Sequence, residues 1–253
     1  MTLPELDSFL SETLNHSAWL GREKAMNGLQ VGRKNLEVRR VAFAVDASLQ
    51  TFERAVVAGA EVLVVHHGLF WGFPLAVTGD HQRRLRFLFE HDLALWASHL
   101  PLDAHPTLGN NAGLAQALGL VSVEPFGEYR GVKIGFKGVL PAPLKLERVC
   151  ETLFHGREKV LQVLPFGKAE VTTVGLVSGG APQEVSDAIA EGLDLYITGD
   201  ADHTIYHQAL EARINVISGG HYATETWGVR LLAAHVKNET GLSTVFLDLP
   251  TGL

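Results

Sequence analysis

Two stretches of the sequence, 133 residues apart, share one pattern of apolar runs and glycines. In each, an apolar run is followed by a helix-like segment, a glycine and a second apolar run, which is the pattern of two parallel strands joined by a helix. Because the whole pattern recurs without a gap, it indicates an internal duplication. The sequence therefore predicts an α/β fold with two pseudo-repeated lobes. The aligned identities pair Val41 with Val174, Gln50 with Gln183, Ala55 with Ala188, and Gly59 with Gly192.

The expected lobes are residues 1–120 and 171–253, which together form one compact unit. Between them, residues 121–170 contain short strand-like pieces such as Val132–Val139 and a helix near Leu144–Phe154, interrupted by proline and glycine. This segment carries no recognisable motif, and we expect it to connect the lobes or to make subunit contacts. Because 46% of the 253 residues are hydrophobic, the chain can bury a sizeable core.

The elements of the first lobe follow from hydrophobic periodicity and from helix-capping residues. Thr2, Pro4 and Glu5 are typical of a helix start, and Asn27-Gly28 is typical of a tight turn before a strand. We expect helices at 2–14, 49–60, 80–91 and from about 111, and strands at 28–32, 38–48, from 62 and from 93.

The first candidate site lies where an apolar strand runs into His66 and His67. Neighbouring strand residues point to opposite faces, so the two histidines can share a ligand only where the strand ends, and Gly68 permits a turn there. In open α/β sheets, sites lie at the carboxyl ends of the strands. The alternative is that one histidine packs under Trp71 while the other caps a loop.

Further ligand-type residues follow other predicted strands. His99, Asp103, His105 and Asn110 lie in the polar loop after the strand that begins near residue 93. In the second copy, Gly199-Asp200 aligns with His66-His67, and His203 follows it closely. After Gly219-Gly220, His221 and Glu225 are four residues apart at a helix start and share one face, as two ligands of one metal site would. The alternative is an exposed His–Glu pair.

If the two copies pack about a pseudo-twofold axis, five of these side chains converge. Three imidazoles and two carboxylates suit zinc, manganese or iron(II), and because carboxylates can bridge, we predict two divalent metal ions per subunit. Such a pair favours hydrolysis as the reaction class. His99 and His203 would hold ligands in place or transfer protons. His105 is a further candidate for this role, although Pro106 suggests that it only shapes its loop. The other histidines are expected at the surface or in packing. The five predicted metal ligands are His66, His67, Asp103, His221 and Glu225.

Composition excludes several classes of protein. The net charge of −7 and the short basic clusters argue against a nucleic-acid partner. Cys150 is the one cysteine, so an internal disulfide and a thiolate metal cluster are excluded, and metal ligands must be nitrogen and oxygen. No apolar run approaches the roughly 20 residues of a membrane span, so we expect a cytoplasmic protein.

Five motifs follow one another along the chain: NGLQVG, VVHHGLFW, HLPLDAHPTLGNN, ITGDADH and GGHYATETWGVR. They resemble the successive signatures of the GTP cyclohydrolase 1 type 2 family, also called Ngg-interacting-factor-like, and of its short bacterial members. The resemblance implies a two-lobed α/β fold with a dinuclear metal centre and a toroidal homohexamer. It places the family's metal ligands on the same five residues. Longer members carry an inserted domain, for which residues 121–170 are too few, and some relatives have Glu in place of Asp200.

The resemblance also bears on function. The family name implies hydrolytic opening of the GTP imidazole ring, whereas this chain has no phosphate-cradling GxxxxGK[ST] loop. From the excess of nitrogen and oxygen ligands, we expect a metal-dependent hydrolase acting on a small nucleotide-like or phosphorylated substrate. The alternative is a non-catalytic, metal-dependent ring scaffold or regulatory protein.

Overall fold

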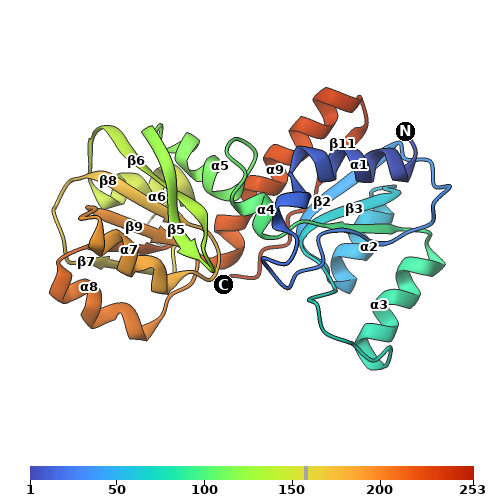
Figure 1. Cartoon of the computed structure of the whole chain (residues 1–253), viewed down its shortest axis with the longest axis horizontal. Coiled ribbons are helices and arrows are strands. Elements are labelled where there is room, and N and C mark those ends of the chain that lie inside the picture. Colours follow the sequence, from blue (N-terminus) through green and yellow to red (C-terminus); the bar gives the residue numbers. More distant parts are fainter. Residues whose placement is uncertain (157–158) are drawn as a thin grey trace. The chain divides into compact units, whose positions relative to one another are not determined.

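The computed structural model describes residues 1–156 and 159–253, which form two compact units (Figure 1). The first unit comprises Met1–Leu102 and Val229–Leu249, and the second comprises Asp103–Gly228 and Pro250–Leu253. These ranges differ from the lobes expected at 1–120 and 171–253. The difference arises because the second unit already begins at Asp103, while the end of the last long helix and the last strand belong to the first.

The first unit contains a five-stranded sheet in the order β1-β4-β3-β2-β11. All neighbouring strands are parallel except β1, which pairs antiparallel with β4. The strands are β1 (Gly28–Val31), β2 (Arg40–Asp46), β3 (Val62–His67), β4 (Ala94–Ala97) and β11 (Ser243–Phe246). The helices are α1 (Leu3–Thr13), η1 (His16–Trp19), α2 (Leu49–Val57), α3 (Gly79–Glu90) and α4 (Leu100–Asp103), which ends in the second unit.

Local signals in the sequence explain where these helices begin and end. Thr2 and Glu5 form the predicted capping box of α1, and its buried face consists of Leu3, Leu6 and Leu10 at helical spacing. The Ser48 side chain caps α2 by accepting a hydrogen bond from the backbone N–H of Thr51. The predicted helices and strands of the first lobe are thus confirmed to within a few residues.

The second unit contains a six-stranded sheet in the order β5-β6-β8-β9-β10-β7, in which β8, β9 and β10 are parallel. The strands are β5 (Val121–Tyr129), β6 (Val132–Leu144), β7 (Gln162–Pro165), β8 (Val171–Val177), β9 (Leu195–Thr198) and β10 (Asn215–Ser218). The helices are α5 (Asn110–Ala117), α6 (Leu146–Phe154), η3 (Pro182–Glu184), α7 (Val185–Ala190), η4 (His203–Ile205), α8 (Tyr206–Ala212) and α9 (His221–Thr240), which ends in the first unit.

Residues 121–170 hold longer strands than the sequence predicted. β5 and β6 span 9 and 13 residues and pair antiparallel. The sequence predicted only short pieces because prolines and glycines interrupt the apolar pattern. Pro125 is accommodated because β5 lies at the sheet edge, and register shifts in both ladders of β6 absorb the remaining irregularity.

The strand registers agree with the predicted duplication. Val41 of β2 pairs with Val62 of β3, and at the same 133-residue shift Val174 of β8 pairs with Leu195 of β9. The glycines that follow the two connecting helices, Gly59 and Gly192, both have positive φ, at 69° and 65°. Each sheet also pairs one antiparallel strand with the third parallel strand: β1 with β4, and β7 with β10.

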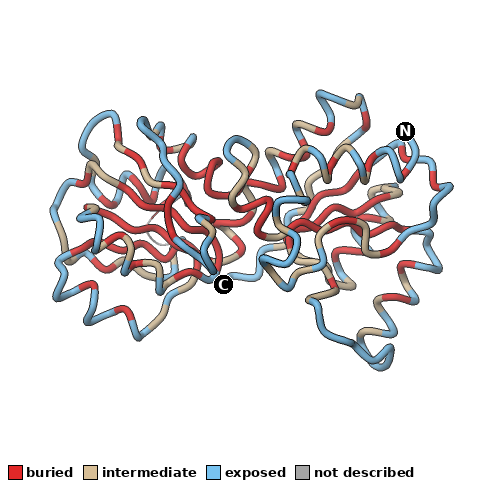
Figure 2. Tube along the Cα trace, in the orientation of Figure 1, coloured by how far each residue is buried: buried red, intermediate tan, exposed pale blue. Residues whose placement is uncertain are grey.

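Each unit has its own buried apolar core along its parallel strands, shown in red in Figure 2. In the first unit, β2 is buried from Val41 to Val45, and β3 from Val62 to His66. Strands covered on both faces need such continuous apolar runs, which explains their composition. Among the described residues, no helix combines the length and the apolar character needed to cross a membrane.

Candidate metal centre

Three histidines of the first unit lie together at the carboxyl ends of β3 and β4. His66 and His67 are the last two residues of β3, and His99 follows β4. Their ring centroids are 4.6 Å apart for His66 and His67, 5.1 Å for His66 and His99, and 5.7 Å for His67 and His99. One ring nitrogen of each lies within 4.8 Å of one ring nitrogen of both others. The strand end thus brings neighbouring histidines together, as the sequence predicted.

Each of these rings is held through its Nδ1 atom. Carbonyl and carboxylate oxygens only accept hydrogen bonds, so each Nδ1 carries a hydrogen and donates the bond. The lone pair of the neutral ring then lies on Nε2. Histidines that bind metals in proteins are oriented in this way. The acceptors are the carbonyl oxygen of Ser98 for His66 (2.9 Å), Oδ1 of Asp46 for His67 (2.8 Å) and Oε2 of Glu23 for His99 (2.6 Å).

His99 is held at two points. The side chain of Glu23 is only 4% exposed, and its second oxygen accepts a hydrogen bond from the Asn27 side chain at 2.7 Å. The Asn27 side-chain oxygen in turn accepts from the backbone N–H of His99 at 2.8 Å. Sequence reasoning assigned Asn27 only to a turn and did not single out Glu23, because neither lies in a periodic segment or near His99 along the chain.

Trp71 and Gly68 border the three histidines. The Trp71 ring meets the His99 ring edge-on at 5.0 Å, and its Nε1 donates to the carbonyl of Gly68 at 3.1 Å. A Cβ atom added to Gly68 would lie 2.3 Å from the side chain of Gln30 and 2.7 Å from that of Ala97. Glycine is therefore required at this position by close packing.

In the second unit, Asp103 is a buried carboxylate, 5% exposed, in a polar network. Its Oδ1 atom accepts from the Asn110 side chain at 2.9 Å and from the Ser178 hydroxyl at 3.0 Å. The Asn110 oxygen accepts from the backbone N–H of Gly228 in α9 at 2.7 Å. Asn110 therefore links the orientation of Asp103 to the helix that carries His221 and Glu225.

His221 and Glu225 lie one turn apart on α9, on one helical face as predicted. His221 Nε2 is 3.2 Å from Glu225 Oε1, and the Glu225 residue is only 3% exposed. Glu225 and Asp200 together raise the pKa of His221 from 6.5 to about 9, Glu225 having the larger effect. The Nδ1 atom of His221 bonds to Asp200 at 2.9 Å, so Asp200 holds His221 as Asp46 holds His67.

The loop after β8 passes very close to these side chains. A Cβ atom at Gly179, where φ is 68°, would lie 2.2 Å from Glu225 Oε1. One at Gly180 would lie 2.9 Å from Asp200 Oδ2. The two glycines therefore let the backbone pass the carboxylates, which the sequence reasoning did not anticipate.

Three further histidines take no part in the contacts described so far. His203 opens η4 and is exposed, three residues beyond Asp200. His105 accepts hydrogen bonds through Nδ1 from the backbone N–H groups of Thr107 and Leu108, so it shapes its loop as expected. His16, expected in packing, stacks on Trp96 with centroids 5.0 Å apart.

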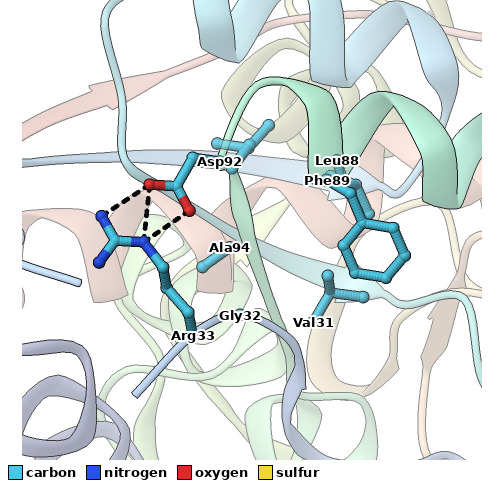
Figure 3. Close-up of a pocket in the computed structure, with 8 residues that line it drawn as sticks. Val31, Gly32, Arg33, Leu88, Phe89, Asp92 and Ala94 are labelled. Carbon is cyan, nitrogen blue, oxygen red and sulfur yellow. Dashed lines mark hydrogen bonds and ion pairs between the residues drawn. The ribbon is translucent and has the colours of Figure 1, made fainter. Parts of the chain in front are cut away.

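A separate cavity of about 250 Å³ lies at the opposite end of β4 (Figure 3). It is lined mainly by apolar atoms of β1, of the end of α3 and of the start of β4. On one side, the guanidinium of Arg33 bonds to both oxygens of Asp92 at 2.8 Å. Because Ala94 begins β4 and His99 follows its end, this cavity is not part of the candidate metal centre.

The donor atoms within each unit suit a divalent transition metal. The first unit offers imidazoles held through Nδ1. The second unit, taken by itself, offers the imidazole of His221 and the buried carboxylates of Asp103 and Glu225. Zinc, manganese and iron(II) bind nitrogen and oxygen donors of this kind. Cys150 is buried in the core of the second unit with α6, so its thiol belongs to packing.

Comparisons with known proteins agree with this fold. The family model of Duf34/NIF3 (NGG1p interacting factor 3) matches residues 1–251. A protein of Pyrococcus horikoshii named GTP cyclohydrolase 1 type 2 homolog is 45% identical over 254 residues, with all of both chains covered. A solved structure from Thermus thermophilus has a TM-score of 0.89 at 41% identity, and protein ybgI has 0.91 at 33%, each over all of both chains. The chain belongs to the Duf34/NIF3 family, which confirms the resemblance seen in the sequence.

Proposed function

We propose that the chain is a metal-dependent hydrolase that holds two divalent ions, zinc, manganese or iron, per subunit. The ligands in this proposal are the five predicted from the sequence, contributed by both units. The observation that carries it is the matched orientation of His66, His67 and His221, each bonded through Nδ1 to a carbonyl or carboxylate. Such bonds fix the tautomer and make the imidazole a better ligand. The buried carboxylates of Asp103 and Glu225 would balance the charge of the ions.

When bound, such ions supply an activated water and stabilise negative charge on a reacting oxygen. The residues of the chain would orient the ligands and transfer protons. Asp46, Ser98 and Asp200 keep the imidazoles oriented, and the Asn110 network keeps the Asp103 carboxylate in place. For His99 and His203 we propose proton transfer to and from the reacting groups, in which Glu23 would hold the His99 proton on Nδ1.

The proposed substrate is small and nucleotide-like or phosphorylated. Relatives that match the whole chain are named GTP cyclohydrolase 1 type 2 homolog, which supports a purine nucleotide as the first candidate. The ring of Trp71, which contacts His99 and His67 and is partly exposed, would offer an aromatic surface for a planar base.

The direct test is a screen for hydrolysis by the metal-loaded protein. The purified chain, loaded separately with manganese, iron and zinc, is incubated with nucleotides, phosphodiesters and cyclic amides, and products are followed by mass spectrometry. We expect turnover of at least one class, lost in His67→Asn and kept in His91→Gln, which alters an exposed histidine of the same unit. No turnover with any of the three metals would contradict the proposal.

A second candidate is a non-catalytic role, in which the ions stabilise a ring-shaped homohexamer that acts as a scaffold or regulator. It is favoured by the division of the proposed ligands between two compact units, since shared ions would tie the units together. Particle size and thermal unfolding are compared with and without a chelator. This candidate predicts that metal removal lowers both the particle size and the melting temperature. It fails if neither quantity changes.

A further inference from the structure

We propose that the cavity at the amino end of β4 binds a small uncharged aromatic molecule, a single ring that carries a hydroxyl group. The cavity measures about 250 Å³, and Figure 3 shows the side chains that line it. All of these residues belong to the first unit, so the site is complete without the second. The site is separate from the candidate metal centre, and the proposal does not rest on the proposed function.

The wall of the cavity is apolar and belongs to the core of the first unit. Leu88 of α3, and Leu93 and Ala94 where β4 begins, are all buried. Two lining positions, Gly32 and Ala94, have no side chain or only a methyl group, and a Cβ atom added to Gly32 would lie 3.1 Å from that of Ala94. Covering apolar surface of this kind with an apolar group is favourable. The wall therefore favours a ligand with an apolar body.

The volume of the cavity limits the size of the ligand. An apolar cavity of about 150 Å³ engineered in another protein binds benzene, and pockets for drug-sized ligands measure about 300–1,000 Å³. The volume of about 250 Å³ lies between these values, so the cavity accepts one ring with a short substituent. A nucleotide is too large for it, which separates this site from the substrate of the proposed hydrolase.

Phe89 supplies an aromatic contact at the rim of the cavity. It is 69% exposed, and its ring lies on the side of the cavity opposite the ion pair of Arg33 and Asp92 (Figure 3). Aromatic rings in offset or edge-to-face arrangements attract one another beyond the area that they bury. An aromatic ligand would cover this exposed ring and gain that attraction, which an aliphatic ligand would lack. Phe89 therefore favours an aromatic ligand.

The ion pair of Arg33 and Asp92 decides the charge of the ligand. The guanidinium donates through Nε to both carboxylate oxygens at 2.8 Å, its Nη2 lies 2.7 Å from Oδ2, and its Nη1 donates to Asn35. Each charge already has its partner, so a charged ligand would lose hydration without meeting an opposite charge. A hydroxyl group can still donate to the carboxylate, because each carboxylate oxygen accepts more than one hydrogen bond. The pair therefore selects an uncharged ring with a hydroxyl group.

The experiment measures binding of 4-fluorophenol to the full chain at neutral pH by fluorine NMR. A chelator is present throughout, so that no metal ion is available to bind the probe. We expect broadening of the probe signal that saturates at millimolar concentrations. The anion 4-fluorobenzoate should bind at least about tenfold more weakly, because its charge would be desolvated without a partner.

Three variants locate the binding. Ala94→Val fills the cavity and should abolish the broadening. Phe89→Ala should weaken binding by about two- to tenfold, which corresponds to the loss of one aromatic pair. Val57→Ala is the matched control, because Val57 is an exposed apolar residue of the same unit that does not line the cavity, and it should change nothing.

No broadening of the 4-fluorophenol signal would overturn the proposal and leave the cavity to a side chain of another copy of the chain or to no ligand. The proposal is also overturned if folded Ala94→Val binds the probe as tightly as the unaltered chain, or if 4-fluorobenzoate binds as tightly as 4-fluorophenol. Should Ala94→Val not fold, Phe89→Ala is compared with Val57→Ala, and equal affinities overturn the proposal. Because the chain is kept free of metal, these results are independent of the hydrolysis screen.

Discussion

At the scale of single residues, the proposed centre would depend on hydrogen-bond acceptors that face imidazole rings. Three carboxylates and one carbonyl accept from Nδ1 of four histidines, and each keeps a proton on Nδ1. Two histidines have pKa values shifted in opposite directions, which gives two tests by pH.

His221 is expected to stabilise the metal-free protein at neutral pH and to lose this effect in alkali. Its folded-state pKa of about 9 lies above the ordinary 6.5, because the protonated ring bonds to Glu225 and Asp200. The stabilisation is complete below pH 6.5 and disappears as the pH rises through 9. In urea unfolding of the metal-free chain, His221→Asn should reduce the fall in unfolding free energy between pH 6.5 and 9. An identical slope in the variant would refute this.

His16 should destabilise the protein in acid. Burial beside Trp96 lowers its pKa from 6.5 to about 4, so the unfolded chain binds more protons between these values. The stabilisation from the neutral ring is present above pH 6.5 and is lost as the pH falls toward 4. His16→Gln, which can still bond to Ser98, should flatten the decline in thermal stability over this window. A decline as steep as that of the unaltered chain would argue against the shifted pKa.

At the scale of elements, Asn110 at the start of α5 joins the Asp103 segment to α9. Its amide nitrogen donates to Asp103 and its oxygen accepts from Gly228, with the side chain fully buried. Asn110→Ala should lower the unfolding free energy by about 1–3 kcal/mol, because buried polar groups lose their partner. Gln116→Ala on the same helix is the control: its bond to Thr107 is exposed, and we expect a change within about 0.5 kcal/mol. Equal losses in urea unfolding would show that the network is not specific.

Elements set by local signals could be predicted, and those set by distant partners could not. Leu3, Leu6 and Leu10 define the buried face of α1, and the four-residue spacing of His221 and Glu225 places them on one face of α9. Glu23 lies 76 residues from His99. No periodicity in the sequence marks such a pair. The β5–β6 hairpin was underestimated for a different reason: bulges and an edge position let proline and glycine enter long strands.

At the scale of the whole molecule, the duplicated strand–helix–strand unit explains why ligand-type residues recur at corresponding places. The 133-residue shift that aligns the strand registers also places Asp200 on His67. The two strand ends differ: in the first unit the strand end carries two candidate ligands, and in the second Asp200 bonds to His221, a candidate ligand on α9. If divalent ions bind the folded chain and not the unfolded chain, the free energy of unfolding should rise with the logarithm of the metal concentration.

That linkage predicts a melting temperature that rises with added Mn²⁺ or Zn²⁺ and returns on chelation. The double variant His66→Asn, His67→Asn should lose most of this rise, while His91→Gln should keep it. Differential scanning fluorimetry over a metal titration measures the effect. A metal-induced rise of equal size in the double variant would place the stabilising ions elsewhere on the chain.

The proposed function requires five side chains to bind two divalent ions per subunit. The most direct measurement is anomalous X-ray scattering from crystals grown with Mn²⁺ or Zn²⁺. We expect two anomalous peaks per subunit, contacted by His66, His67, Asp103, His221 and Glu225. Peaks located away from these side chains, or a metal-saturated crystal in which the five residues contact no ion, would contradict the claim.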